Sequence, residues 1–297
     1  MVENKKVKVL SQLMVYFIML IVTFLCIFPF LVVLSASFSS ESELVVNGYS
    51  LFPQKFTTLA YKVIISDPSQ LISAYTVTIF VTIVGSIASI LTMTLGAYPL
   101  SRTNFKWRRG ISFYFYFTTI FSGGAVATYI WISHGMNLKN NVLVLILPLM
   151  VSAWNVFLLR TYFTQIPPSL IEAAKIDGAN EYYIFFKIVI PMSTVGVATV
   201  LVMVSLGYWN DWYNCMMYMT KDKYISLQYY LYRVMSEIDS MKNMSNVVLQ
   251  QQVDISSLPN ETARMAMCIL AAGPMVFVFS FFQKYFVRGI AVGSVKG

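Results

Sequence analysis

Charged residues are scarce in this chain of 297 residues. Only 11% of its residues are Asp, Glu, Lys or Arg, whereas 57% are hydrophobic and the mean hydropathy is +0.66. A soluble globule of this length needs more polar residues than these to cover its surface. The composition therefore excludes a soluble globular domain and predicts an integral membrane protein.

Cysteine and histidine are nearly absent. Cys26, Cys215 and Cys268 fall in or beside apolar runs without CxxC spacing, so neither a disulfide framework nor a metal site is expected. The single His134 has no partner for catalysis nearby in sequence and is expected to be solvated or interfacial. Since HExxH and GxxxxGK[ST] motifs are also missing, we expect no catalytic residue, metal or cofactor in this chain.

Long apolar runs dominate the sequence instead. Six of them reach the roughly 20 residues that a transmembrane helix needs, namely 14–34, 71–100, 111–132, 142–163, 192–219 and 262–286. They are apolar on all sides rather than alternating, which predicts an all-α bundle and not a β-barrel. In the second run, Ala88, Thr92 and Gly96 recur every four residues, which predicts a narrow face that a neighbouring helix approaches closely.

Basic residues gather on one side of the predicted membrane. The two chain ends and the loops 101–110 and 160–191 hold thirteen basic and four acidic residues, a formal charge of +9. The other side holds eight basic and nine acidic residues, a formal charge of −1. The positive-inside rule therefore places both termini in the cytoplasm. Because the basic residues line membrane boundaries and form no single patch, nucleic-acid binding is not expected.

These assignments divide the chain into a membrane domain and two tails. We expect a cytoplasmic tail over 1–12, a six-helix membrane domain over 13–286 and a second cytoplasmic tail over 287–297. The longer outer loops are 36–70 and 220–260, and the second is expected to be partly helical. That loop is either an amphipathic helix on the bilayer surface or a contact surface for an extracytoplasmic partner.

A polar interruption, the 164–191 loop, separates the fourth and fifth runs. Pro167-Pro168 ends the fourth run, and Ser169 with Glu172 has the spacing of a capping box, so a short helix over 170–177 is expected. Ala173 and Ala174 have small side chains, so another protein can pack closely against this helix. Gly178, after Asp177, is expected to stop it in the left-handed conformation.

The second half of this loop predicts another helix. Asn180 is expected to cap it, and Pro191 to open the fifth span. Its expected apolar stripe consists of Tyr182, Phe185, Phe186 and Val189. Taken alone, such a loop is either a corner at the membrane surface or a docking site for another protein.

The full spacing resembles a known motif. Glu172-Ala173-Ala174, three residues, Gly178, nine residues and Ile188-x-Ile190-Pro191 resemble the EAA loop of ABC importer permeases, which in that family inserts into a cleft of the cytoplasmic ATPase. Further matches cover the chain from about residue 20 to its end: Phe121 to Gly124, Asn155, Pro167 to Pro191, Tyr208 to Trp212, Leu227-Gln228 and Gln283 to Gly297. Together they resemble carbohydrate importer permeases, most closely the second, shorter permease of oligosaccharide systems.

The resemblance implies a complete transport system. It implies the type I ABC importer permease fold, with the EAA coupling loop between helices 4 and 5, in a bacterial cell membrane. The implied partners are a second permease forming a heterodimer, a cytoplasmic ABC ATPase that binds ATP and Mg, and an extracytoplasmic solute-binding protein that delivers the sugar. In place of the family's proline after Gly123-Gly124 stand Ala125-Val126-Ala127, which predicts a weaker kink near the outer end of span three.

A polar and aromatic cluster lies near the outer end of the fifth run. It consists of Trp209, Asn210, Asp211, Trp212 and Asn214, with Tyr213 among them. Aromatic faces stack on sugar rings and amides or carboxylates bond sugar hydroxyls, so the cluster suits a carbohydrate path. It is equally an ordinary composition for a membrane interface.

Other functions remain open at this point. A permease for a non-sugar solute has the same coupling loop. An ion-coupled secondary transporter is expected to show mid-membrane carboxylates or an inverted repeat, and a membrane enzyme needs a catalytic constellation; the sequence shows neither clearly.

Overall fold

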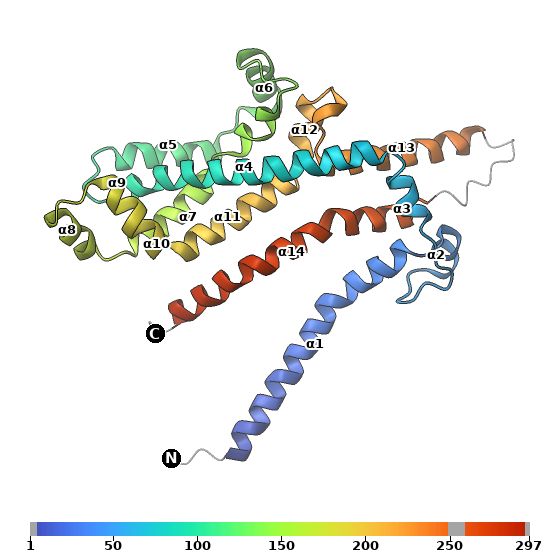
Figure 1. Ribbon diagram of the computed structural model, residues 1–297, viewed down its shortest axis with the longest axis horizontal. Helices are drawn as coiled ribbons and strands as arrows, with labels where there is room; N and C mark the ends of the chain where they lie inside the picture. The colour runs from blue at the N-terminus through green and yellow to red at the C-terminus, as the bar shows by residue number, and fades with distance from the viewer. Residues whose placement is uncertain (1–4, 249–258, 295–297) are drawn as a thin grey trace. The chain divides into compact units, whose positions relative to one another are not determined.

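The computed structural model of the chain is helical (Figure 1). It describes residues 5–248 and 259–294, with side-chain surroundings for 12–240, 259–276, 278 and 283. Within these residues there is no strand, and an isolated bridge between Ser39 and Phe56 is the only β pairing. The predicted helical class is therefore confirmed.

The chain forms two compact units. One comprises residues up to Asp67 together with Arg233–Gly273, and the other comprises Pro68–Tyr232 together with the residues from Pro274 onward. Two helices contribute to both units, namely α13 (Leu227–Val248) and α14 (Glu261–Ser294). The expectation that the 220–260 loop is partly helical is confirmed by α13.

The first unit contains α1 (Lys5–Ser37), α2 (Glu41–Asn47) and α3 (Leu59–Ile64). Its α14 begins at a carboxylate from a distant part of the chain: Glu41 accepts hydrogen bonds from the amides of Glu261 and Thr262, both at 3.0 Å, and from the Thr262 hydroxyl at 2.8 Å. Glu41 is buried. Because the first amides of a helix have no partner within the helix, this carboxylate caps α14.

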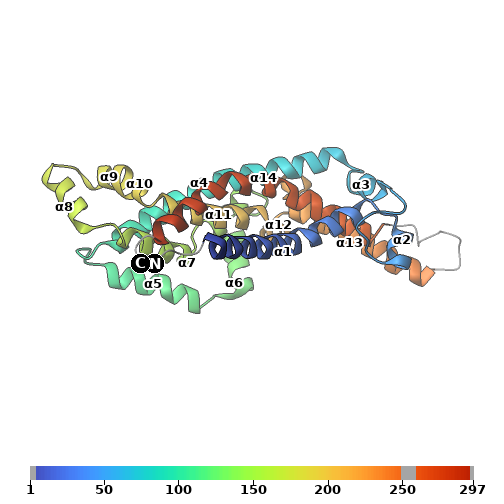
Figure 2. The same cartoon turned by 90° about the horizontal axis from the view of Figure 1, so that it is seen from below.

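The second unit is built around three helices that lie side by side in Figures 1 and 2, namely α4, α7 and α11. Its elements are α4 (Pro68–Ser101), α5 (Arg108–Ile120), α6 (Gly124–Ile130), η1 (Trp131–Gly135), η2 (Val142–Leu145), η3 (Leu147–Leu149), α7 (Ala153–Thr164), α8 (Pro168–Ile176), α9 (Glu181–Ile184), η4 (Phe185–Val189), α10 (Ile190–Met192), α11 (Thr194–Trp209), α12 (Tyr213–Tyr218) and η5 (Asp222–Tyr224). In this list η1 and η4 are π-helices.

The close approach between α4 and α11 lies on a different face of α4 from the one predicted. Tyr208 of α11 packs on Gly85, where an added Cβ would lie 2.6 Å from the ring. The Tyr208 hydroxyl bonds Ser89 at 3.0 Å and donates to the Ile146 carbonyl at 2.9 Å. The face predicted from Ala88, Thr92 and Gly96 is not the one that meets α11, since Thr92 is exposed and an added Cβ on Gly96 meets no atom of the described chain within 4 Å.

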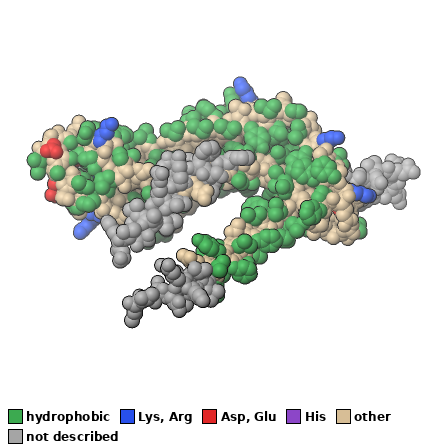
Figure 3. Space-filling model, turned by 60° about the horizontal axis from the view of Figure 1, so that its bottom comes forward, with side chains coloured by type: hydrophobic (Ala, Val, Ile, Leu, Met, Phe, Trp, Pro, Cys, Tyr) green, Lys and Arg blue, Asp and Glu red, His purple; other side chains and the backbone are tan. Residues whose placement is uncertain are grey.

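Length and hydropathy single out two described helices as membrane spans, residues 12–37 of α1 and all of α4. The number rises to as many as five if three bent pairs of helices are each one span. The bends are 113° between α5 and the α6–η1 pair, 52° between η2–η3 and α7, and 81° between the stretch ending in α10 and α11. Hydrophobic side chains cover much of the face seen in Figure 3, and charged ones are few.

The breaks in these spans were not all predicted. The kink in span three is sharp rather than weak, because Gly124 adopts φ +80° and turns the chain without a proline. The predicted run 192–219 is not one helix, since α11 ends at Trp209 and α12 begins only at Tyr213. The sixth predicted span, 262–286, is helical as part of α14, although many of its later side chains lie outside the described set.

Candidate functional site

The short helix of the 164–191 loop is α8, and it begins earlier than predicted. Pro167 is the residue before the helix and Pro168 is its first residue, a position where a missing N–H costs nothing. No side chain caps this end, so the predicted capping box between Ser169 and Glu172 is wrong. Both side chains are exposed, and Glu172 is therefore free of the structural role that the spacing assigned to it.

The end of α8 agrees with the prediction. The helix stops at Ile176, Asp177 follows as its cap, and Gly178 adopts φ +82°. Ala173 is exposed and Ala174 is half-buried, so neither adds bulk to the helix surface. The predicted cap of the following helix is also confirmed, because the Asn180 side chain accepts from the amide of Tyr183 at 2.8 Å.

The expected apolar stripe of the second half is only partly present. Phe185 and Val189 are buried, together with Ile184, whereas Tyr182 and Phe186 are exposed. The reason is η4, whose π-helical turn shifts the register of side chains that an α-helix would align. Pro191 lies in the first turn of α10, and α11 begins only after a break at Ser193.

Three side chains tie this loop to the end of α4. Glu181 accepts a hydrogen bond from the Tyr98 hydroxyl at 2.5 Å and pairs with the Lys175 ammonium at 2.5 Å. The Arg102 guanidinium lies over the Tyr98 ring, 4.7 Å from its centre. Hydrogen bonds from Lys175 and Tyr98 lower the pKa of Glu181, which belongs to the loop rather than to a predicted span. No sequence pattern predicts this cluster, because its members are up to 83 residues apart.

The outward side of α8 exposes large apolar side chains beside polar ones such as Glu172. Ile171 is the buried residue of α8, while Leu170, Ala173 and Ile176 lie on its exposed side, and Ile176 is 86% exposed. Tyr182, just beyond the Gly178 turn, is 74% exposed. A short helix that presents large apolar side chains to solvent in this way is typical of a contact surface for another protein.

The second candidate site is the polar and aromatic cluster after α11. Trp209 and Asn214 are buried, whereas Trp212 is exposed. Asp211 accepts from the Asn214 amide at 3.2 Å and from its side-chain nitrogen at 3.0 Å, so this carboxylate holds the start of α12. The structure thus brings all the predicted residues into one turn, but leaves only part of them accessible.

Residues of α13 complete this cluster. Tyr232 stacks on Trp212 with ring centres 5.1 Å apart, and Tyr229 stacks on Tyr232 at 6.4 Å. The Gln228 amide donates to the Asn210 side chain at 3.3 Å. Sequence reasoning placed these tyrosines only in an outer loop. Their spacing of three residues on a helix is the signal that could have indicated a shared aromatic face.

Metal ligands do not cluster in the described part of the chain, where no group of three or more His, Cys, Asp or Glu could hold an ion. The cysteines Cys26, Cys215 and Cys268, all within the described residues, form no disulfide, and His134 is exposed in η1.

Comparison with known proteins gives consistent similarities. Residues 1–292 match the family described as binding-protein-dependent transport system inner membrane component. The chain is 33% identical to the polygalacturonan/rhamnogalacturonan transport system permease protein YtcP of Bacillus subtilis (strain 168), over 97% of this chain and 99% of the relative. It is 26% identical to the arabinooligosaccharides transport system permease protein AraQ of Halalkalibacterium halodurans, over 93% of each chain.

A solved structure shares the fold. The chain superimposes with a TM-score of 0.75 on a protein in the crystal structure of a bacterial ABC transporter involved in the import of the acidic polysaccharide alginate. The two are 25% identical, and the match covers 96% of this chain and 99% of the other.

Proposed function

Since the chain belongs to the family of binding-protein-dependent transport system inner membrane components, and is thus a transport subunit of an ABC transporter rather than an enzyme, we propose that it is one of two permeases in an ATP-driven importer of a carbohydrate. A second permease completes the translocation path as a heterodimer. A separate ABC ATPase binds ATP and Mg and supplies the energy. An extracytoplasmic solute-binding protein delivers the solute.

In the proposed topology the chain crosses a bacterial cell membrane six times, with both termini in the cytoplasm. The +9 formal charge on the side that carries the 164–191 loop supports this orientation. In this topology α1 and α4 are the first two spans, the bent stretches Arg108–Gly135 and Val142–Thr164 are the third and fourth, α11 is the fifth, and α14 supplies the last. The 164–191 loop then lies on the cytoplasmic side, where an ATPase can reach it.

The observation that carries the proposal is the form of this loop, which we call the coupling loop. Its α8 exposes Leu170 and Ile176 while Gly178 fixes the turn that follows. The residues proposed for the ATPase contact are Ser169, Glu172, Ala173, Ala174, Asp177, Gly178 and Pro191, with Ile176 added from its exposure. The role proposed for Glu172 is contact with the partner, because it does not cap its own helix.

The proposed mechanism is mechanical. Closure of the ATPase displaces α8, and the Tyr98–Glu181–Lys175 cluster transmits this displacement to the cytoplasmic end of α4. α4 passes it to α11 through the contact between Gly85 and Tyr208. Because α11 ends beside the aromatic cluster of Trp212 and Tyr232, movement of these helices can open or close the outer end of the path.

The proposal of a carbohydrate rests on the relatives and on this aromatic cluster. The names of the relatives and of the solved transporter refer to polygalacturonan, rhamnogalacturonan, arabinooligosaccharides and alginate, all of them built of linked sugars. The stacked rings of Trp212 and Tyr232 are both partly exposed, and Asn210 with Asp211 offers polar groups beside them. We restrict proposed sugar contact to these four residues, because Trp209 and Asn214 are buried.

The direct test is purification of the chain with its membrane partners, followed by mass identification and uptake of labelled oligosaccharides. The proposal predicts that an ABC ATPase and a second permease copurify and that uptake needs ATP. Copurification with uptake of a non-sugar solute alone would remove the carbohydrate assignment. Uptake that follows an ion gradient, without any ATPase in the preparation, would indicate a secondary transporter instead.

A further inference from the structure

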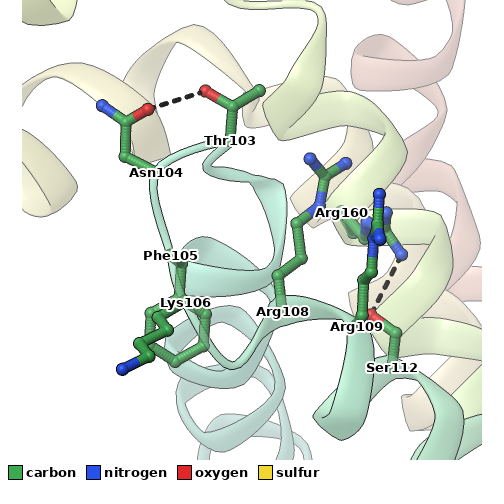
Figure 4. A pocket seen from close by; sticks show the side chains of 8 residues that line it. All are labelled: Thr103, Asn104, Phe105, Lys106, Arg108, Arg109, Ser112 and Arg160. Atoms are coloured by element: carbon green, nitrogen blue, oxygen red, sulfur yellow. Dashed lines mark hydrogen bonds between the residues drawn. The ribbon is translucent and has the colours of Figure 1, made fainter.

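Three arginines converge on one cavity beside the start of α5 (Figure 4). The cavity measures about 730 Å³, and its lining consists of Thr103, Asn104, Phe105, Lys106, Arg108, Arg109, Ser112 and Arg160. Arg108 and Arg109 form the first turn of α5, whereas Arg160 comes from α7. The described lining thus contains four basic residues and no carboxylate.

The arginines face one another across helices that are far apart in sequence. Figure 4 shows the Arg108 and Arg109 side chains extending in the same direction, beside Arg160, whereas Lys106 points away from them. Arg160 donates a hydrogen bond to the Ser112 hydroxyl at 3.3 Å. Among the described residues, none of the three arginines forms an ion pair. Their charges are therefore close together without compensation.

The start of α5 makes this arrangement less favourable still. Trp107 precedes the helix and supplies no side-chain cap, and the first turn has no acidic residue. A helix N-terminus carries about half a positive charge, so basic side chains in the first turn are destabilising. The positive-inside rule needs only that charges lie on this side of the membrane, and does not account for three guanidinium groups around one cavity. An anion in the cavity offsets both the repulsion among the three arginines and the repulsion between the first-turn arginines and the helix N-terminus.

We propose that this cavity binds a phosphate group, and that its source is the headgroup of an acidic phospholipid such as phosphatidylglycerol. Arginine suits phosphate because its planar fork donates two parallel hydrogen bonds to the oxygens. The loop 101–110 lies at the predicted inner boundary of the membrane, where acidic lipids concentrate, and basic pockets between helices there can bind lipid headgroups.

The surroundings of the cavity fit a lipid better than a free ion. Trp107 is 67% exposed at the start of α5, and tryptophan is enriched at the level of lipid headgroups. No residue of α5 is buried, and Phe113 and Phe117 lie exposed beyond the arginines. The helix therefore offers an apolar surface for acyl chains directly beyond a basic site for the headgroup.

The test uses the whole transporter complex in vesicles of phosphatidylcholine with a minor fraction of phosphatidylglycerol. After extraction in mild detergent, the phosphatidylglycerol retained per complex is measured by mass spectrometry. Each basic residue near an acidic lipid surface contributes a factor of about five to binding. We therefore expect Arg108→Gln/Arg109→Gln/Arg160→Gln to lower retention by about a hundredfold, and Arg109→Gln alone by about fivefold.

A matched control removes the same charge elsewhere. Lys55→Gln/Lys62→Gln/Lys139→Gln alters three exposed lysines outside the cavity and is expected to leave retention unchanged. Equal retention by wild type and the arginine variants, or an equal loss in the lysine control, would overturn the proposal. If the triple arginine variant fails to assemble, Arg109→Gln decides, because Arg109 is exposed and its replacement leaves the packing intact.

The source of the phosphate is tested separately with inorganic phosphate. It is titrated against the purified complex that retains phosphatidylglycerol. Lipid that stays bound as phosphate rises supports the headgroup assignment. If inorganic phosphate displaces the lipid at the phosphate concentration that fills the cavity, the cavity is a site for free phosphate, and the lipid assignment is overturned.

Discussion

Replacement of Gly178 by valine is expected to weaken binding of the ATPase without disturbing the packed core. Gly178 has φ +82°, and an added Cβ would meet no atom within 4 Å, so the effect comes from the backbone alone. The left-handed conformation costs a residue with a Cβ about 1–2 kcal/mol. An energy of this size corresponds to a factor of about 5 to 30, which is the largest expected fall in the population of the ordered turn. The apparent affinity of an ATPase that binds only this turn falls by up to the same factor.

The assay measures the dissociation constant of the ATPase from the purified permease pair, together with ATP-dependent sugar uptake. Gly48→Val is the matched control, because Gly48 has φ +76°, has equally open surroundings and lies in the predicted outer loop 36–70. Gly178→Asn is expected to retain most function, since asparagine tolerates the left-handed conformation. Unchanged affinity and uptake in Gly178→Val, or equal losses in both valine variants, would refute the reasoning.

Three further predictions concern the contacts that support the sites. Gly85→Ala is expected to lower the stability of the purified complex by about 1–3 kcal/mol, because the added methyl group overlaps the buried Tyr208 ring. Gly96→Ala on the same helix is the control, since an added Cβ there meets no atom within 4 Å, and its thermal midpoint is expected to be unchanged or higher. Glu41→Ala removes a buried carboxylate that accepts three hydrogen bonds from the start of α14, so proteolysis of that helix start is expected to increase. Glu41→Gln keeps one acceptor and is expected to lose less protection. Equal protection of the wild type and both variants would contradict this prediction. Under the proposed function, Trp212→Ala lowers uptake at limiting sugar by about two- to tenfold and Trp212→Phe restores most of it, whereas equal uptake by the alanine variant would exclude ring stacking at this position.

Features set by neighbouring residues were predictable from the sequence. The run 71–100 is interrupted only by hydroxyl-bearing and small residues, and α4 extends over Pro68–Ser101 as one helix. Gly178 and Asn180 act within a few residues of their own positions, and both adopt the predicted roles. The failure at Ser169 has a local cause too: proline prefers the first turn of a helix, so α8 begins at Pro168, two residues earlier than predicted.

Features set by distant residues were not predictable. Hydropathy averages over a window, so it missed the left-handed Gly124 and the end of α11 at Trp209, where a few residues redirect the chain. It also cannot choose which small residues of α4 meet a neighbour, because that depends on Tyr208, far along the chain. The partners of Trp212 and Glu181 depend in the same way on how helices pack.

The central claim, that the coupling loop contacts the ATPase, is tested most directly by photo-crosslinking from position 176 in the assembled transporter. A photoreactive residue replaces Ile176, which is 86% exposed on α8, and a second variant carries it in place of Val46, which is 80% exposed in the predicted outer loop. Position 176 is expected to crosslink to the ATPase, and position 46 is not. Crosslinking from position 46 instead, or none from position 176 in a complex that retains its ATPase, would contradict this claim.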